Sequence, residues 1–257
     1  MLISKIIVEN SQGQILLVRR SKTAPLRAFD WEFPGGIVED GEDPKYAAIR
    51  ELEEEAGIST KTAEYIFAGT SPEYRHSGFF FYAIVDNPEP KLSYEHDKYK
   101  WVRLNEAIDI VTVKAYKTAL EYYKKFKHNK VIVSTKALIN YNGKTLAVRR
   151  SAGDVGGGNW DLPGGQLEVG EDLKEVIHRE IIEETSLTVT KSEIIFAHTE
   201  VVNNEVRIRI GQVASVSGDK VKLSHEHDDF RWLNNRVYEF MDHKYWPGWR
   251  EFVKSYS

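Results

Sequence analysis

The feature that most constrains the fold of this chain is an internal repeat whose period is close to half of its 257 residues. The repeated pairs are ILLVRRS (Ile15 to Ser21) and TLAVRRS (Thr145 to Ser151), WEFPGG (Trp31 to Gly36) and WDLPGG (Trp160 to Gly165), and SYEHDKYKW (Ser93 to Trp101) and SHEHDDFRW (Ser224 to Trp232). Their offsets are 130, 129 and 131 residues, so the halves align with only small differences in loop length. Because solenoid repeats are about 20 to 50 residues long, this period predicts two whole domains.

We predict that the first domain spans residues 1–128 and the second spans residues 129–257. The boundary falls in the basic segment YYKKFKHNK (Tyr122 to Lys130), which we interpret as a solvated helix face that runs into a linker. Helix-like spacing precedes this segment, and VIVSTKALIN after it restarts the pattern of the N-terminus. A chain of this length has room for two domains of ordinary size.

Each half has the same predicted order of elements. Two β-rich runs are joined by a turn, which contains Gly13 in the first half and Asn142-Gly143 in the second, a strong hairpin signal. A loop with Pro-Gly-Gly leads into a helix, capped by Asp43 before Pro44 in the first half and by Asp172 with Glu175 in the second. Strand-like segments follow, among them residues 78–85 and 205–213, and each half closes with a helix.

Composition excludes several classes of protein. The chain has no cysteine, so it has no disulfide framework, thiolate metal site or cysteine nucleophile. Its net charge of −4 argues against a general nucleic-acid or anionic-membrane binder, although a local basic patch remains compatible with it. The apolar run at the N-terminus is too short for a signal peptide, and no run has the length of a membrane span. We therefore expect a cytoplasmic protein with no membrane partner.

The most unusual local feature is an acidic cluster that both halves share. RELEEEAGI (Arg50 to Ile58) and REIIEETSL (Arg179 to Leu187) each place three glutamates at positions i, i+3 and i+4, which form one face of a helix. The off-face position differs between the halves, with Glu53 in one and Ile182 in the other. Like charges on one helix face repel each other, so the pattern calls for a hard divalent cation such as Mg²⁺ or Mn²⁺.

These clusters lie in a wider frame that resembles the Nudix box, G-x5-E-x7-R-E-U-x-E-E-x-G-U, where U is aliphatic. The first half matches every fixed position, with Gly36, Glu42, Arg50, Glu51, Leu52, Glu54, Glu55, Gly57 and Ile58. The second half matches with Gly165, Glu171, Arg179, Glu180, Ile181, Glu183, Glu184 and Leu187, and Ser186 replaces the second glycine. A non-glycine residue in a left-handed cap costs about 1 kcal/mol, which a domain tolerates. We therefore expect both sites to bind metal.

The resemblance implies an α/β (α+β) fold in each domain, with a mixed β-sheet sandwiched between helices and the box as a loop-helix-loop. It also implies Mg²⁺-dependent hydrolysis of a nucleoside diphosphate that is linked to another moiety. The implied metal ligands are Gly36 (through its carbonyl), Glu51, Glu54 and Glu55 in the first domain, and Gly165, Glu180, Glu183 and Glu184 in the second. The implied pairs that orient these glutamates are Glu42 with Arg50 and Glu171 with Arg179. Which carboxylate acts as the general base stays open between the last box glutamate and a loop carboxylate.

Two further groups of residues are candidates for the site. Glu95 and Glu226 lie in the repeated EHD, and each either activates the attacking water or has a structural hydrogen-bonding role. The adjacent pairs Arg19-Arg20 and Arg149-Arg150 end the second strand of each half, where they could hold substrate. Since side chains alternate along a strand, we expect at most one arginine of each pair to serve.

The resemblance leaves the substrate open. Our leading hypothesis is a phosphohydrolase for small nucleotides, with nucleoside triphosphates, ADP-ribose and dinucleoside polyphosphates as candidates. The alternatives are removal of pyrophosphate from RNA 5′ ends, which would need a basic groove, and a single catalytic domain beside a ligand-sensing one. The tandem itself would be either a monomeric pseudo-dimer or part of a homodimer.

Overall fold

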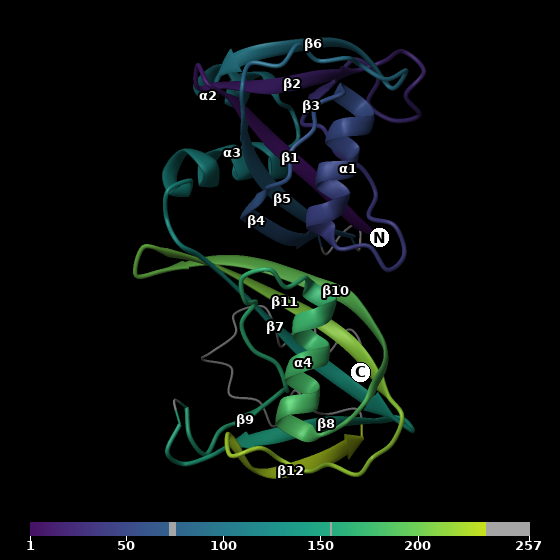
Figure 1. The fold of residues 1–257 in the computed structure, drawn as a ribbon, viewed down its shortest axis with the longest axis vertical. Coiled ribbons are helices and arrows are strands. Elements are labelled where there is room, and N and C mark those ends of the chain that lie inside the picture. Colours follow the sequence, from purple (N-terminus) through teal and green to yellow (C-terminus); the bar gives the residue numbers. More distant parts are fainter. Residues whose placement is uncertain (72–75, 155, 235–257) are drawn as a thin grey trace. The chain divides into compact units, whose positions relative to one another are not determined.

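A computed structural model describes residues 1–71, 76–154 and 156–234 of the chain (Figure 1). The chain divides into two compact units, one formed by Met1–Val131 with Thr199–Val206 and the other by the remaining described residues from Ile132 onward. Among the described residues, no helix is long and apolar enough to cross a membrane.

The first domain is built on a six-stranded mixed sheet. Its strands are β1 (Leu2–Asn10), β2 (Gln14–Arg20), β3 (Trp31–Glu32), β4 (Glu64–Ser71), β5 (His76–Val85) and β6 (His96–Arg103). The strand order is β3-β2-β1-β5-β4, and β6 also pairs with β2. β1 and β5 run parallel, whereas β2 pairs antiparallel with β1, β3 and β6.

Helices cover the sheet of the first domain because its central strands are apolar on both faces. Consecutive residues of β1 (Ile6 to Val8) and of β2 (Ile15 to Val18) are fully buried, which requires cover on each side. The helix α1 (Pro44–Ala56) packs against β1 with Ala47, Ala48 and Leu52, all fully buried. The predicted closing segment forms two helices, α2 (Leu104–Ile110) and α3 (Lys114–Phe126). The chain turns between them at Val111, whose backbone is extended.

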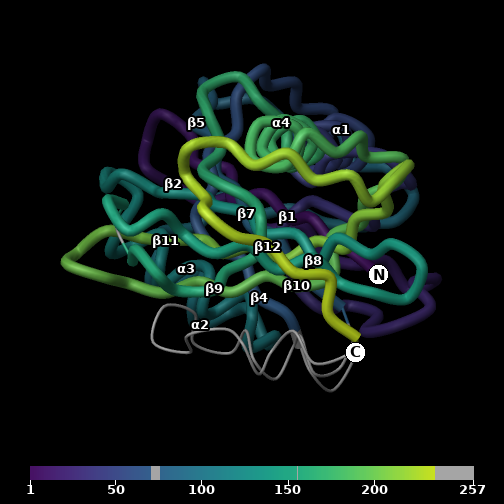
Figure 2. The backbone as a smooth tube through the Cα atoms, turned by 90° about the horizontal axis from the view of Figure 1, so that it is seen from below, coloured from purple at the N-terminus to yellow at the C-terminus, as the bar shows by residue number. Residues whose placement is uncertain are grey.

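The second domain repeats this architecture. Its elements are β7 (Val131–Tyr141), β8 (Lys144–Arg150), β9 (Trp160–Asp161), α4 (Leu173–Thr185), β10 (Val189–Val202), β11 (Glu205–Val216) and β12 (His227–Asn234). The strand order is β10-β11-β7-β8-β12, and β9 also pairs with β8. The antiparallel neighbours β8 and β12 are visible side by side in Figure 2. The predicted closing helix of this domain falls in residues 235–257, outside the described residues.

The predicted turns and caps are confirmed. Asn142 and Gly143 form the two-residue turn between β7 and β8, and both have positive φ, at 47° and 76°. Asp43 caps α1 through Lys45 N–H, and Asp172 forms a complete capping box with Glu175 on α4. Gly57 ends α1 in the left-handed region at φ 63°, and Ser186 ends α4 there at φ 57°. The serine thus preserves the cap geometry of the second box.

The predicted α/β (α+β) class is confirmed, with one mixed sheet and one box helix in each half. We propose that the boundary between the two domains lies between residues 128 and 129. It falls between the end of α3 at Phe126 and the start of β7 at Val131.

Candidate active site

One arginine holds together the acidic face of each box helix. In α1, Arg50 donates from Nε and Nη2 to the two oxygens of Glu42, at 2.9 Å each. Its Nη1 donates to Glu51 at 2.9 Å and to Glu54 at 3.2 Å. The structure therefore brings together four residues that the sequence placed in one cluster.

Domain two reproduces this arrangement almost atom for atom. Arg179 binds both oxygens of Glu171, at 2.6 and 3.0 Å, and its Nη1 contacts Glu180 at 2.9 Å and Glu183 at 3.2 Å. Such charge-assisted bidentate bonds fix the direction of the side chains as well as their distance. The off-face Ile182 is exposed to solvent, as is Glu53 in the first domain.

The two box glycines lie against the first glutamate of each cluster. A Cβ on Gly36 would lie 2.5 Å from Glu51 Oε1, and one on Gly165 would lie 2.1 Å from Glu180 Oε1. The carbonyl oxygens of these glycines accept hydrogen bonds from Ser4 N–H and Thr135 N–H, at 2.9 Å each. Since a carbonyl oxygen has two lone pairs, each retains one for a further partner.

The last glutamate of each box points inward. Glu55 and Glu184 are buried, and one oxygen of each accepts a hydrogen bond from the backbone N–H of Gly35 or Gly164, at 2.8 and 2.9 Å. Burial raises the pKa of Glu55 to about 7 and that of Glu184 to about 8. Burial thus separates Glu55 and Glu184 from the glutamates that precede them, since the side chains of Glu54 and Glu183 are 59% and 58% exposed.

A buried lysine in each domain was missed by the sequence analysis. Lys5 lies on β1 and contacts Glu32 of β3 at 3.3 Å, and Lys136 lies on β7 and contacts Asp161 of β9 at 2.8 Å. The positive charge of Lys5 lowers the pKa of Glu55, and that of Lys136 lowers the pKa of Glu184. In both glutamates burial acts in the opposite direction and has the larger effect. The sequence signal was the polar residue at the second position of WEFPGG and WDLPGG, where an apolar residue would suit a buried strand.

The arginine pairs divide as strand alternation predicts. Arg19 and Arg149 lie toward solvent and form ion pairs with Asp97 and Asp228, at 2.7 and 2.6 Å. The next residue in each domain turns inward. Arg20 contacts Glu32 at 2.8 Å, and Arg150 contacts Asp154 at 2.6 Å.

The loop glutamates have different surroundings in the two domains. Glu226 is half-buried and lines a cleft, whereas Glu95 is exposed. The backbone carbonyl of each accepts a hydrogen bond from the serine that follows the inward arginine, Ser21 or Ser151. The structure therefore brings Glu226 into a cavity with box glutamates.

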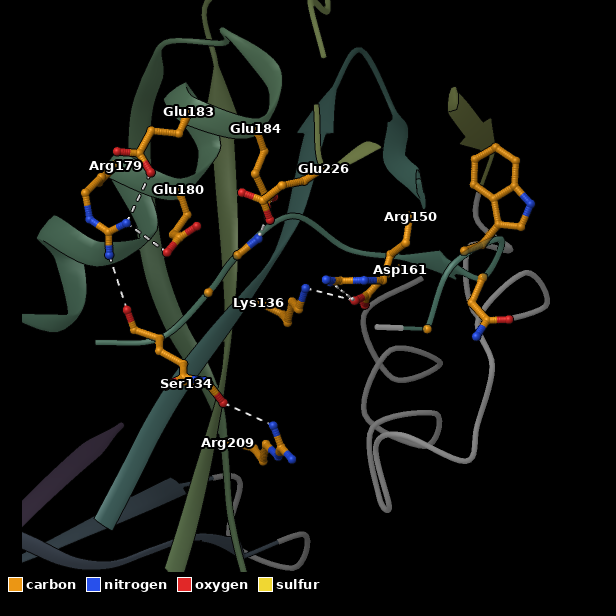
Figure 3. Close-up of a pocket in the computed structure, with 16 residues that line it drawn as sticks. Ser134, Lys136, Arg150, Asp161, Arg179, Glu180, Glu183, Glu184, Arg209 and Glu226 are labelled. Carbon is orange, nitrogen blue, oxygen red and sulfur yellow. Dashed lines mark hydrogen bonds and ion pairs between the residues drawn. The ribbon is translucent and has the colours of Figure 1, made fainter. Parts of the chain in front are cut away.

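This cleft in the second domain has a volume of about 540 Å³ (Figure 3). Figure 3 shows Glu180, Glu183 and Glu184 beside Arg179 on one side, and Lys136, Arg150 and Arg209 on the other, where Asp161 lies beside Lys136 and Arg150. Trp160 and Asn159 also line it. A cavity with acidic and basic walls suits an anionic ligand that is held together with a cation.

Comparison with known proteins agrees with this geometry. A family model described as the NUDIX domain matches residues 4–126 and again residues 130–256. The chain belongs to the NUDIX family. The two tandem NUDIX domains predicted from the boxes are therefore confirmed.

The NUDIX chain is similar to proteins with different named activities. It is 36% identical over 80 residues to a putative 8-oxo-dGTP diphosphatase of Bacillus subtilis, which covers 31% of this chain and 50% of that protein. It is 29% identical over 128 residues to the RNA pyrophosphohydrolase of Caulobacter vibrioides, which covers 41% of this chain and 73% of that one. The chain thus spans only about half the length of the first of these relatives. A solved MutT protein from Methanosarcina mazei is 32% identical, with a TM-score of 0.43 over 50% of this chain and 94% of that one.

The donor set of each NUDIX box suits a hard cation. Carboxylate oxygens of Glu51 and Glu54 converge on a single nitrogen of Arg50, and Glu180 and Glu183 do the same at Arg179. Within the part of the chain that the structure describes, no three histidine or acidic side chains already surround a common point. The candidate ligands of each box are all oxygen atoms, with no thiolate or imidazole among them, and such a donor set favours Mg²⁺ or Mn²⁺.

Proposed function

We propose that this NUDIX protein hydrolyses the pyrophosphate linkage of a nucleoside diphosphate that is joined to another moiety, and that Mg²⁺ or Mn²⁺ is its cofactor. The candidate substrates are nucleoside triphosphates, ADP-ribose and dinucleoside polyphosphates. The diphosphatase and pyrophosphohydrolase names of the relatives support this class of reaction without selecting one substrate.

The cleft of the second domain carries the proposal. Within one cavity of about 540 Å³ it joins three box carboxylates to Lys136, Arg150 and Arg209. A diphosphate is repelled by a bare acidic cluster, so an acidic wall and a basic wall in one cleft fit a complex of diphosphate and cation.

We assign each group in the cleft a role that its surroundings support. The metal, when bound at the box glutamates, would neutralise the diphosphate and lower the pKa of an attacking water. Arg179 fixes Glu180 and Glu183, while Gly164 N–H fixes one oxygen of Glu184. Glu184 is a candidate proton acceptor because it lines the cleft beside the other box glutamates, and burial raises its pKa to about 8 in the metal-free protein. Glu226, which lines the same cleft, is the competing candidate.

In the first domain we propose the matching set: Gly36, Glu42, Arg50, Glu51, Glu54 and Glu55. Of the two arginine pairs, we propose Arg20 and Arg150 as the substrate-facing members, because Arg19 and Arg149 are held at the surface by aspartates. The carbonyls of Gly36 and Gly165 complete the proposed metal ligands.

A phosphate-release screen over a nucleotide panel tests the proposal. Wild type, Glu55→Gln, Glu184→Gln and the double variant are compared with and without Mg²⁺, and Glu53→Gln serves as control because it lies off the box face. Loss of a positioned base costs about 100- to 10,000-fold, so the double variant should be inactive while the control matches wild type. Full Mg²⁺-dependent turnover by the double variant would refute the assignment.

RNA with a 5′ triphosphate belongs in the same panel, because one relative is named an RNA pyrophosphohydrolase. Two of the lysines that could form a basic groove already contact the domain itself, since Lys124 donates to Asn105 and Lys127 donates to Glu9. We therefore rank small nucleotides first. Turnover of the RNA alone would reverse that order.

We further propose that the protein acts in the cytoplasm as a pseudo-dimer within one chain. Two boxes in one chain give it the pair of sites that a homodimer of single domains would have. Its mass in solution, measured by light scattering, separates a monomer from a homodimer.

A further inference from the structure

The two NUDIX domains differ at a buried histidine beside the box. His96 and His227 occupy the same place in the fold, since each begins the strand that pairs with β2 or β8 and lies opposite Arg20 or Arg150. Both rings are buried. In the first domain, Nε2 of His96 lies 3.2 Å from Glu32 Oε1. In the second domain, neither ring nitrogen of His227 has a hydrogen-bond partner among the described residues.

One methylene group accounts for this difference. Glu32 and Asp161 hold equivalent positions on β3 and β9, but the aspartate carboxylate lies about 1.5 Å closer to its own backbone. Both Asp161 oxygens are already engaged, one with Lys136 at 2.8 Å and the other with the backbone N–H of Leu162 at 2.8 Å. The longer Glu32 contacts its lysine and reaches the histidine with Oε1, the oxygen that also accepts from Arg20 at 2.8 Å.

The histidine faces the inward glutamate of the box in the first domain. Nδ1 of His96 lies 4.0 Å from Glu55 Oε1, while the other oxygen of Glu55 accepts from Gly35 N–H at 2.8 Å. Nδ1 of His96 has no hydrogen-bond partner among the described residues, so Gly35 N–H holds one Glu55 oxygen and the His96 ring only borders the other. For Glu184 the matching bond from Gly164 N–H restrains one oxygen. When Nε2–H of a neutral imidazole donates to a carboxylate, Nδ1 is left unprotonated, so such a bond fixes both the ring and its tautomer.

We propose that Glu32 fixes the His96 ring that borders Glu55, and that Asp161 does not fix His227, so the two NUDIX sites of this chain are not equivalent. Glu32 and His96 are positioning residues, since the structure connects them to the reaction only through Glu55. This inference rests on the proposed function for its effect on turnover, but the state of the rings can be measured without turnover.

The first experiment observes the rings directly in the full chain without metal. Nitrogen-15 NMR of labelled histidine, at about pH 8.5 where an ordinary histidine is neutral, distinguishes the Nε2–H from the Nδ1–H tautomer. His96 should be in the Nε2–H form alone and His227 should be a mixture of the two. Asp161→Glu should convert His227 to the Nε2–H form, and Glu32→Asp should release His96 into a mixture. A mixed His96 in wild type, or a His227 that Asp161→Glu leaves unchanged, would overturn the inference.

Tyr116→Phe is the matched control. The Tyr116 hydroxyl donates to Glu32 Oε2 at 3.2 Å, whereas His96 contacts Oε1. This variant therefore disturbs the same carboxylate on its other side, and it should leave the His96 tautomer unchanged. A tautomer change as large as that of Glu32→Asp would show that any disturbance of Glu32 acts on the ring, which contradicts a specific pair.

The second experiment measures the effect on catalysis one site at a time. With the second site removed by Glu184→Gln, Glu32→Asp should lower kcat about tenfold and leave KM within about twofold. With the first site removed by Glu55→Gln, Asp161→Glu should raise kcat. A tautomer that responds while kcat does not would disprove the positioning of Glu55. If wild type hydrolyses no nucleotide, the proposed function fails instead, and the NMR result still decides whether Glu32 fixes the ring.

Discussion

At the scale of single residues, the three glutamates of each box have different surroundings although they are close in sequence. Glu54 is largely exposed, Glu51 is half-buried beside Arg50, and Glu55 is buried against Gly35 N–H. Burial raises the pKa of Glu51 and raises that of Glu55 further, to about 7. The helical period places all three glutamates on one face of α1. How deeply each one is buried depends on the strands and loops that pack against that face.

The buried carboxyl of Glu184 should make the metal-free protein less stable at alkaline pH. Its pKa is about 8 in the folded state against 4.5 ordinarily, so the folded state binds more protons than the unfolded state between these values. The free energy of unfolding therefore falls as pH rises from about 4.5 to 8. Glu184→Gln, which stays neutral, should raise the free energy of unfolding at pH 8 by about 1 to 4 kcal/mol. Urea denaturation in EDTA across this pH range measures it.

Glu183→Gln is the control for this prediction because its side chain is 58% exposed. It should change stability little at either pH. An equal rise in the free energy of unfolding with Glu183→Gln, or a fall with Glu184→Gln at pH 8, would contradict the claim that burial of the Glu184 carboxyl destabilises the protein at this pH.

Adjacent glycines in the Pro-Gly-Gly bend should respond differently to alanine. A Cβ on Gly164 would lie 2.2 Å from the backbone oxygen of Thr135, at a φ of 137°, so Gly164→Ala should cost several kcal/mol of stability. The three atoms nearest to a Cβ on Gly165 all belong to the carboxyl end of the Glu180 side chain. Gly165→Ala should therefore fold normally and lose Mg²⁺ affinity, as measured by calorimetry of the folded variant. Equal unfolding of both variants would refute this distinction.

The residues of the site that sequence could predict are those with a local signature. The box positions follow from the helical period, and the strand period indicates that the two arginines of each pair point to opposite sides, but not which one faces inward. Lys5 and Glu32 could not be recognised in this way, because a buried ion pair depends on which strands the sheet brings together. The dissimilar environments of Glu95 and Glu226 likewise depend on the loops around them, although their EHD sequences are identical.

At the scale of elements, helix ends were predicted more accurately than short strands. Caps have a chemical signature, and both N-caps and the left-handed C-cap at Gly57 follow the sequence, whereas Ser186 adopts the left-handed conformation without glycine. The two-residue strands β3 and β9 have no period to detect, yet they supply Glu32 and Asp161. The segment after β6 had one continuous helical pattern, but it divides at Val111 into α2 and α3 because its apolar residues face two different neighbours.

The C-cap of α1 should require glycine more strictly than other positive-φ positions do. Gly57 has φ 63°, and a Cβ there would lie 3.0 Å from Lys91 Cβ. Gly41 has φ 79° with open space around it, so Gly41→Ala isolates the cost of backbone conformation. We expect Gly41→Ala to cost about 1 kcal/mol and Gly57→Ala to cost more, as measured by thermal unfolding. Equal losses would show that the Lys91 contact relaxes freely.

At the scale of the whole molecule, duplication explains both what is shared and what differs. The atoms around Arg50 and Arg179 match closely, which is expected if both boxes were kept for one kind of chemistry. The differences fall around them, at Glu32 and Asp161 beside the box and at Glu53 and Ile182 on the outer helix face. The repeat was sufficient to predict two domains of the same fold. What each sequence difference between the domains does can be inferred only from the contacts that the residue makes in the structure.

Each site is assembled from the box, buried lysine and glycine bend of its own domain, so the two activities should add. On a substrate that both sites accept, the turnover of Glu55→Gln and of Glu184→Gln should sum to that of wild type, because changes at independent sites are additive. Steady-state rates at saturating nucleotide and Mg²⁺ measure this sum, with the double variant as the baseline. The shares should be unequal if Glu32 positions Glu55, since Asp161 gives Glu184 no such support. Complete loss in only one of the single variants would mean that one domain does the chemistry, and complete loss in both would mean that the domains work as one catalytic unit. A sum well above wild type would mean that each site restrains the other.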